Sequence, residues 1–367
     1  MVCGDQDPCC ARHDRLYLPT MLVRRTLTVA FLTWTLLGAW EQAESSETDD
    51  TAFLLEKREV ALPSGRRMNV VCAGKGSPTV LVESGLGSHM LHWQKVAGRI
   101  SRLTKACFYD RAGFGYSDPS PSPLAAISVT DDLHALLHQA KIAGPLVLVG
   151  HSLGGLYTTV FANRFHKSVS GMVLIDPSFA RQDKDLAPAQ RAQDEVSYKA
   201  SLAGLRSCAV LARSGKLSTE LHEECFAFAS NRKPAEKAFL LYQFTRPYRY
   251  EAMASEIVAQ HSSDGISDVN SREELATRRD YGNMPLIVLT AERPQNPNQT
   301  GAESELAATA WTSWKAGHDE LASRSRNGAS VVVANTGHFI QLDRPDAVIE
   351  AVTKVVEAAR RGHAKTP

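Results

Sequence analysis

The chain has 367 residues, of which 43% are hydrophobic and 22% charged, and its formal net charge at pH 7 is +1. These proportions are typical of a soluble globular protein with one large α/β domain or two small ones. The small net charge gives no electrostatic basis for binding nucleic acid or an anionic surface. We therefore expect no nucleic-acid partner.

The N-terminal region contains a short apolar run. Arg24 and Arg25 precede the apolar residues 27–40, and the polar sequence EQAESSETDD follows them. The run is shorter than the roughly 20 residues that span a membrane, and its basic start is typical of a secretory signal peptide. We expect residues 1–52 to be an extension with a signal peptide and a polar linker, and the protein to be secreted. If the run were not cleaved, it would tether the protein to a membrane.

Four cysteines follow the apolar run, an even number that permits three different disulfide pairings in an exported protein. Cys208 and Cys225 are close enough in the sequence to close a small loop. Cys72 and Cys107 lie in two strand-like segments that a sheet can bring side by side. Four buried free thiols are the alternative.

Short apolar runs alternate with longer amphipathic stretches from residue 58 onward. The later apolar runs are continuous, which is typical of strands buried on both faces of a parallel sheet. This alternation predicts an α/β fold with a doubly wound, mostly parallel, eight-stranded sheet. The expected strands are 58–62, 67–74, 78–85, 106–113, 145–152, 171–178, 285–292 and 330–338, and the expected helices are 89–104, 128–142, 154–166, 302–324 and 345–361.

Residues 179–280 interrupt this alternation. They contain no clear strand, are rich in Ala, Glu, Lys, Arg and Gln, and are too many for a simple connection. We predict a helical lid over the carboxyl ends of the strands, where open α/β sheets bind ligands. The lid would divide the core into residues 53–178 and 281–367. Its aromatic residues form either the lid core or the wall of an apolar pocket: Phe239, Tyr242, Phe244 and Tyr248.

The segment PLVLVGHSLGG, residues 145–155, places Ser152 in the pattern Gly-x-Ser-x-Gly. A buried-strand pattern precedes the serine and a helical pattern follows it, which is the strand–turn–helix arrangement of a nucleophile elbow. The glycines leave room for a strained turn and for the helix to pack closely. The helix N-terminus would place N–H groups beside the hydroxyl. A tight turn with an idle serine is the alternative.

Two further segments accompany this one, YDRAGFGYSD at 109–118 and NTGHFIQLDRPD at 335–346. Together the three resemble the α/β-hydrolase fold family over roughly residues 58–358, and are most similar to its esterases and lipases. Ser152 disfavours the relatives that use an aspartate nucleophile, the haloalkane dehalogenases and epoxide hydrolases. The resemblance implies a serine hydrolase that acts on a small-molecule acyl substrate without a cofactor or a metal. Asp110 and Arg111 would brace neighbouring loops.

A serine hydroxyl needs a base to take its proton. His338 suits this role, because it follows the last strand on a short loop and comes late in the chain, in the family order of serine, acid and histidine. The acid must orient the imidazole from a strand end. Asp176 ends the strand after the nucleophile, where some members carry their acid. Glu292 follows the strand after the lid, the commoner location, but an aspartate is usual there, so we favour Asp176 and keep Glu292 as the alternative.

The negative oxygen of the tetrahedral intermediate needs two backbone N–H donors. One is expected from Leu153, which follows the nucleophile. The other is expected from the loop SGLGS at 84–88, which stands in place of the His-Gly pair common in the family, and by position it is the N–H of Leu86. A glycine-rich turn with no ligand is the alternative for this loop.

These residues predict an enzyme that cleaves a carboxylic ester through Ser152, His338 and Asp176 with an acyl-enzyme intermediate. The same three residues would also serve an acyltransferase, an amidase or a carbon–carbon bond hydrolase. A hydrolase-like protein that only binds a ligand is the alternative from another class. No residues in the sequence have convincing metal-ligand spacing.

Overall fold

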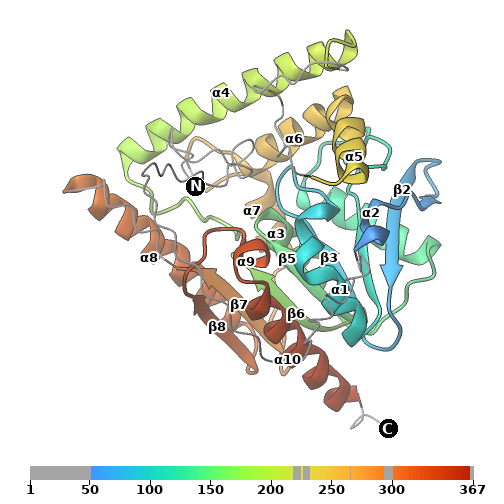
Figure 1. Ribbon diagram of the computed structural model, residues 1–367. Helices are drawn as coiled ribbons and strands as arrows, with labels where there is room; N and C mark the ends of the chain where they lie inside the picture. The colour runs from blue at the N-terminus through green and yellow to red at the C-terminus, as the bar shows by residue number, and fades with distance from the viewer. Residues whose placement is uncertain (1–50, 218–224, 226–231, 265, 293–300, 364–367) are drawn as a thin grey trace, which may run out of the picture.

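The computed structural model describes residues 51–217, 225, 232–264, 266–292 and 301–363. The predicted signal peptide and the possible tether at 27–40 lie outside these residues. Eight strands form one sheet in the order β1-β2-β4-β3-β5-β6-β7-β8 (Figure 1). The strands are β1 (Glu59–Ala61), β2 (Arg67–Ala73), β3 (Thr79–Glu83), β4 (Ala106–Tyr109), β5 (Leu146–His151), β6 (Val169–Ile175), β7 (Leu286–Ala291) and β8 (Gly328–Val333).

The sheet is mostly parallel, as predicted. Strand β2 runs antiparallel to β1 and to β4, whereas β4-β3-β5-β6-β7-β8 are parallel throughout. Because parallel strands need long crossover connections, helices must cover both faces. The carboxyl ends of β3, β5, β6 and β7 therefore meet at one edge of the sheet.

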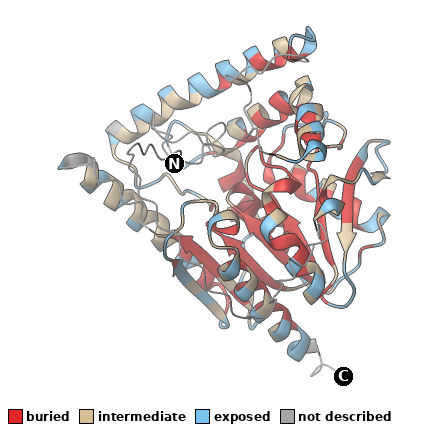
Figure 2. Ribbon diagram, viewed as in Figure 1, coloured by how far each residue is buried: buried red, intermediate tan, exposed pale blue. Residues whose placement is uncertain are grey.

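Side-chain alternation along the strands divides the core between the two faces. In β6, Val173 and Ile175 enter one core, and Met172 and Leu174 enter the other. Figure 2 shows these central strands as buried. The first core is covered by α1 (Gln94–Leu103) and α10 (Pro345–His363), and the second by α2 (Ala126–Gln139), α3 (Leu153–Arg164) and α8 (Ala302–Ser323).

The chain between β6 and β7 forms four helices in its described part: α4 (Pro188–Arg213), α5 (Pro234–Phe244), α6 (Pro247–Gln260) and α7 (Val269–Thr277). Helix α4 packs along α6, and α7 packs against α2 and α3. In Figure 1, α4 lies at the outer edge of the molecule, beyond α6. Helix α6 reaches the carboxyl edge of the sheet, because Gln260 Nε2 donates to Ser178 Oγ at 3.1 Å.

The aromatic residues of this insertion pack against other side chains. Phe239 is buried, and its ring centroid lies 5.3 Å from that of Tyr116 and 5.8 Å from that of His89. The Tyr242 ring lies 5.0 Å from that of Tyr116. Phe239 therefore packs into the core on one face of the sheet, with residues outside the insertion. None of the helices in the described ranges is long and apolar enough to cross a membrane.

Two disulfides join the four cysteines in the pairs that the sequence suggested. Cys72 and Cys107 stand opposite each other in the β2–β4 ladder with their Cα atoms 4.1 Å apart. Cys208, on α4, bonds Cys225 across a separation of 17 residues. Cross-linking restricts the unfolded chain, more so for a longer loop.

Removing the Cys72–Cys107 disulfide, whose cysteines are 35 residues apart, should destabilise the chain more than removing Cys208–Cys225. Loop entropy gives about 4 kcal/mol for the first and about 3 kcal/mol for the second. Urea denaturation of the two double Cys→Ser variants measures both losses. Equal or reversed losses would contradict the expected order.

Candidate active site

Ser152 occupies a strained turn between β5 and α3. Its φ of 54° and ψ of −128° lie outside the usual regions for a residue with a side chain. The turn is held by the backbone: the Ser152 N–H donates to Ile175 O (3.0 Å), and its carbonyl accepts from the N–H groups of Gly155 (2.8 Å) and Ser178 (2.9 Å). Backbone strain of this kind costs about 1–3 kcal/mol and is concentrated at functional sites.

The glycines around the serine are required by close contacts. A Cβ on Gly150 would lie 2.4 Å from Thr158 Oγ1, and one on Gly154 would lie 2.4 Å from the carbonyl oxygen of Ser84. Either contact is too short for a real side chain. The elbow therefore packs directly onto the loop that follows β3.

Asp176 follows β6, and each of its two carboxylate oxygens accepts hydrogen bonds from a different set of partners. Oδ1 accepts hydrogen bonds from the N–H of Ala291 (3.1 Å) and from Trp314 Nε1 (2.9 Å). Oδ2 accepts from His338 Nδ1 at 2.6 Å. The carboxylate is 4% exposed and the imidazole 19%. Oδ1 thus fixes the carboxylate to β7 and α8, and Oδ2 fixes the orientation of the imidazole.

Asp176 should give the fold an acid-sensitive contribution to stability. Burial raises the pKa of Asp176, but its hydrogen bond to His338 and the charge of that ring lower it more, to about 2. A carboxylate whose pKa is lower in the folded chain than in the unfolded chain stabilises the fold above the unfolded value. The roughly 2–3 kcal/mol involved should be lost as pH falls from about 4 towards 2. Urea unfolding over this range should show the loss in the native chain, and a loss of equal size in Asp176→Asn would contradict it.

Glu292, the alternative acid, is bound elsewhere. Its N–H donates to Val333 O at 3.1 Å, and its Oε2 accepts from the N–H of Asn335 at 2.8 Å. These contacts connect the end of β7 to the loop after β8. The structure therefore brings His338 to Asp176. Glu292 is instead hydrogen-bonded to the loop that precedes the histidine.

His338 is joined to the elbow through His151, the residue before the serine. His151 Nε2 donates to the backbone carbonyl of His338 at 2.9 Å, and the two ring centroids are 4.7 Å apart. Burial, followed by the nearby His338 ring, holds the pKa of His151 well below its usual 6.5, so the ring is neutral. Among the described residues no hydrogen bond joins Ser152 Oγ to His338. Such bonds are often long until a substrate is bound.

The two expected oxyanion donors have no acceptor within the described part of the chain. Neither the N–H of Leu153 nor that of Leu86 donates to a protein atom there. The Leu86 loop lies beside the nucleophile, because a Cβ on the neighbouring Gly85 would be 3.2 Å from Ser152 Cβ. The loop that carries one of these amides and the helix N-terminus that carries the other both adjoin Ser152, which suits stabilisation of a developing negative charge.

Sequence reasoning identified only some of the residues that support this site. Arg111 braces the loop after β3, as expected, by donating from Nη2 to Gly85 O at 2.6 Å. Trp314 on α8 and Glu256 on α6 were not predicted. No local pattern marks either of them, because their roles come from contacts with distant segments.

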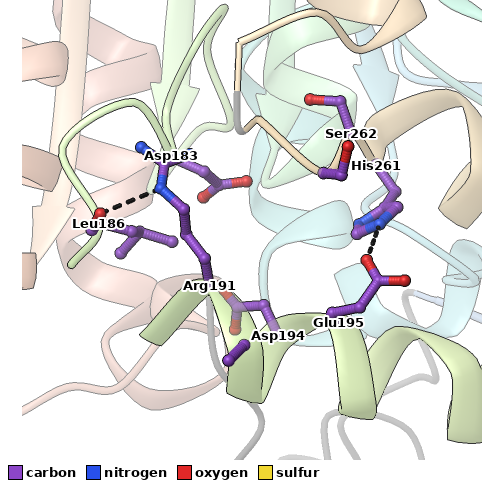
Figure 3. A pocket seen from close by; sticks show the side chains of 9 residues that line it. Asp183, Leu186, Arg191, Asp194, Glu195, His261 and Ser262 are labelled. Atoms are coloured by element: carbon purple, nitrogen blue, oxygen red, sulfur yellow. Dashed lines mark hydrogen bonds and ion pairs between the residues drawn. The ribbon is translucent and has the colours of Figure 1, made fainter. Parts of the chain in front are cut away.

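A pocket of about 230 Å³ lies within the insertion (Figure 3) and contains none of the predicted site residues. In it, Arg191 Nε donates to Leu186 O at 3.1 Å and His261 Nε2 donates to Glu195 Oε2 at 2.9 Å. Polar groups on its wall are thus already paired with one another. In the described ranges no group of three or more His, Cys, Asp or Glu side chains is placed to hold a metal ion.

The sequence of residues 80–351 matches the model of the alpha/beta hydrolase family. The chain belongs to this family. The family and fold class predicted from the sequence are thereby confirmed.

Curated relatives of this α/β-hydrolase match it over different lengths. An uncharacterized vacuolar membrane protein of Saccharomyces cerevisiae (strain YJM789) is 36% identical over 106 residues, which are 28% of this chain and 16% of the yeast protein. The chain thus matches only a small part of that longer relative. Uncharacterized protein YqjL of Bacillus subtilis (strain 168) is 23% identical over 287 residues, covering 78% of this chain and 86% of its own length.

Solved structures share the fold of this α/β-hydrolase. A putative lipase from Acinetobacter baumannii AYE superimposes with a TM-score of 0.58 and 15% identity, covering 85% of this chain and 95% of its own. The enol-lactonase from Burkholderia xenovorans LB400 gives a TM-score of 0.53 and 18% identity, covering 82% of this chain and all of its own.

Proposed function

We propose that this α/β-hydrolase is a serine hydrolase that cleaves carboxylic esters, with Ser152 as nucleophile, His338 as base and Asp176 as the acid that orients it. The observation that carries the proposal is the 2.6 Å hydrogen bond between His338 Nδ1 and Asp176 Oδ2. It fixes the imidazole tautomer, because an Nδ1 that donates its proton leaves Nε2 free to accept one.

In the proposed reaction, Ser152 Oγ attacks the ester carbonyl while His338 Nε2 takes the hydroxyl proton. The carbonyl oxygen becomes negative between the N–H groups of Leu86 and Leu153. When the carbonyl re-forms, the bond to the alcohol oxygen breaks, and His338 returns the proton to the departing alcohol. A water molecule then attacks the acyl-enzyme by the same route and releases the acid.

A fluorophosphonate probe tests the nucleophile, because such probes react with activated serines. The native chain should be labelled, and Ser152→Ala should not. Labelling of neither chain would favour a hydrolase-like binding protein. Undiminished labelling of Ser152→Ala would show that another residue reacts.

The substrate class requires a separate measurement. A series of acyl esters of increasing chain length, run beside amide and lactone substrates with the same acyl groups, compares the proposed activity with its alternatives. Ester turnover should exceed amide turnover. Faster amide turnover, or acyl transfer to an added alcohol in preference to water, would replace the ester-hydrolase proposal with an amidase or an acyltransferase on the same residues.

We also propose that the protein is exported. Two disulfides support this, because such bonds persist in oxidising compartments. Sequencing the N-terminus of the mature protein tests the proposal. A start beyond Trp40 is expected, whereas retention of residues 27–40 would favour the membrane tether.

A further inference from the structure

Lid helix α6 holds both polar backbone groups of Gly87, the residue that follows the predicted donor Leu86. The Gly87 N–H donates to Glu256 Oε2 at 2.9 Å, and the Gly87 carbonyl accepts from Arg249 Nη2 at 3.0 Å. Glu256 is fully buried and Arg249 is 4% exposed. Charged side chains from the insertion are thus used to hold one turn of the loop after β3.

Arg111 holds the same loop through two further backbone groups. Its Nη1 donates to Ser84 O at 2.5 Å, and its Nη2 donates to Gly85 O at 2.6 Å. Its Nε donates to Glu256 Oε1 at 2.7 Å. Glu256 therefore links the two sets of contacts: its Oε2 accepts from the loop at Gly87, and its Oε1 accepts from Arg111.

These contacts determine which way the Leu86 N–H points. The Gly85 carbonyl and the Leu86 N–H belong to one trans peptide unit, in which the two groups point in opposite directions. Because Arg111 binds the carbonyl, the N–H must face away from Arg111. The positively charged guanidinium of Arg111, which donates to the carbonyl oxygen, also polarises the peptide, and this makes its N–H a stronger donor.

The network is buried. Glu83 completes it by accepting from Arg111 Nη1 at 2.6 Å, so two buried carboxylates, Glu83 and Glu256, are both paired with Arg111. Removing one charge from such a buried set leaves another uncompensated, and the surrounding backbone must move or admit water to solvate it. The loop backbone at 84–87 is the part most directly bonded to these groups.

We propose that Glu256 and Arg111 are positioning residues for acyl transfer: they hold the Leu86 N–H beside Ser152, so that lid helix α6 sets the rate of the reaction. This inference rests on the proposed function. It makes the lid a part of the catalytic geometry in addition to any role in covering the substrate.

The test compares Glu256→Gln with Glu274→Gln. Glu274 is a matched control, because it is also a buried glutamate of the insertion, paired with Arg324 at 2.5 Å and bonded to no residue of the 84–88 loop. Loss of one oxyanion donor costs about 10²–10³ in kcat. Misplacement of one should cost less, and we expect Glu256→Gln to lower kcat for an ester about 10- to 100-fold with KM changed less than about 3-fold. Glu274→Gln should leave kcat within about 3-fold of the native value.

Hydrogen exchange of the 84–88 peptide supplies a readout that does not depend on activity. Exchange should rise in Glu256→Gln and stay native in Glu274→Gln. Native kcat in Glu256→Gln, unchanged exchange, or equal effects in both variants would overturn the positioning role while leaving the proposed function intact. A native chain without ester turnover would overturn the proposed function, and the exchange data would then still decide whether α6 holds the loop.

Discussion

Replacing Ser152 with alanine should lower kcat for an ester by about 10⁶-fold, because the acyl-enzyme can no longer form. His338→Ala should cost about the same, since a serine hydroxyl without a base is a poor nucleophile. The double variant should lose no more than either single one, because residues that act as a unit are not additive. Steady-state and single-turnover kinetics of the three variants provide the measurement.

The neighbouring His151 supplies a control for this experiment. Its ring is neutral and already donates to the His338 carbonyl, so its hydrogen bond supports the loop that carries the base. His151→Gln should therefore lose far less activity than His338→Ala. If His151 proved the more damaging position, the assignment of the base would have to move to His151.

Asp176→Asn should lower kcat by about 10⁴-fold, because an amide cannot hold the imidazole in the required tautomer or stabilise its cation. The asparagine side chain has nearly the same shape, so its oxygen can still accept from Ala291 and Trp314 in the Oδ1 position. The variant should consequently remain folded at neutral pH. Kinetics are best measured beside a circular dichroism spectrum that establishes this.

Glu292→Gln is the matched variant for this comparison. Glu292 binds the N–H of Asn335 and not the histidine, so its replacement should change kcat by less than about 10-fold, well short of the loss expected for the orienting acid. A loss of about 10⁴-fold in Glu292→Gln, with Asp176→Asn close to native, would transfer the role of the acid to Glu292.

The position of Asp176 has a consequence for the energetics of the site. It directly follows β6 at the carboxyl edge of the sheet, where Trp314 and the Ala291 N–H already bind its other oxygen. Strand β6, the end of β7 and helix α8 thus orient the Asp176 carboxylate independently of the imidazole. This reduces the entropy lost when the Asp176–His338 hydrogen bond forms.

The sequence by itself determined the parts of this protein that depend on local patterns. Continuous apolar runs predicted the parallel strands, and both their number and the covering helices were confirmed. The elbow around Ser152 was readable because a sharp strand-to-helix turn demands small residues at fixed spacing. Short spacing in the sequence suggested the Cys208–Cys225 pair, and neighbouring strands suggested the Cys72–Cys107 pair. Both disulfides are present in the structure.

Only the tertiary structure decided which distant side chains meet. Asp176 and Glu292 each follow a strand, so the sequence allows either of them to reach His338. The order of the strands in the sheet and the path of the loop after β8 bring the imidazole to Asp176. Glu256 lies 145 positions from Arg111, and no periodicity connects a lid helix to a loop after β3. Such contacts depend on how whole elements pack, and burial of paired charges is a property of the assembled fold rather than of any segment.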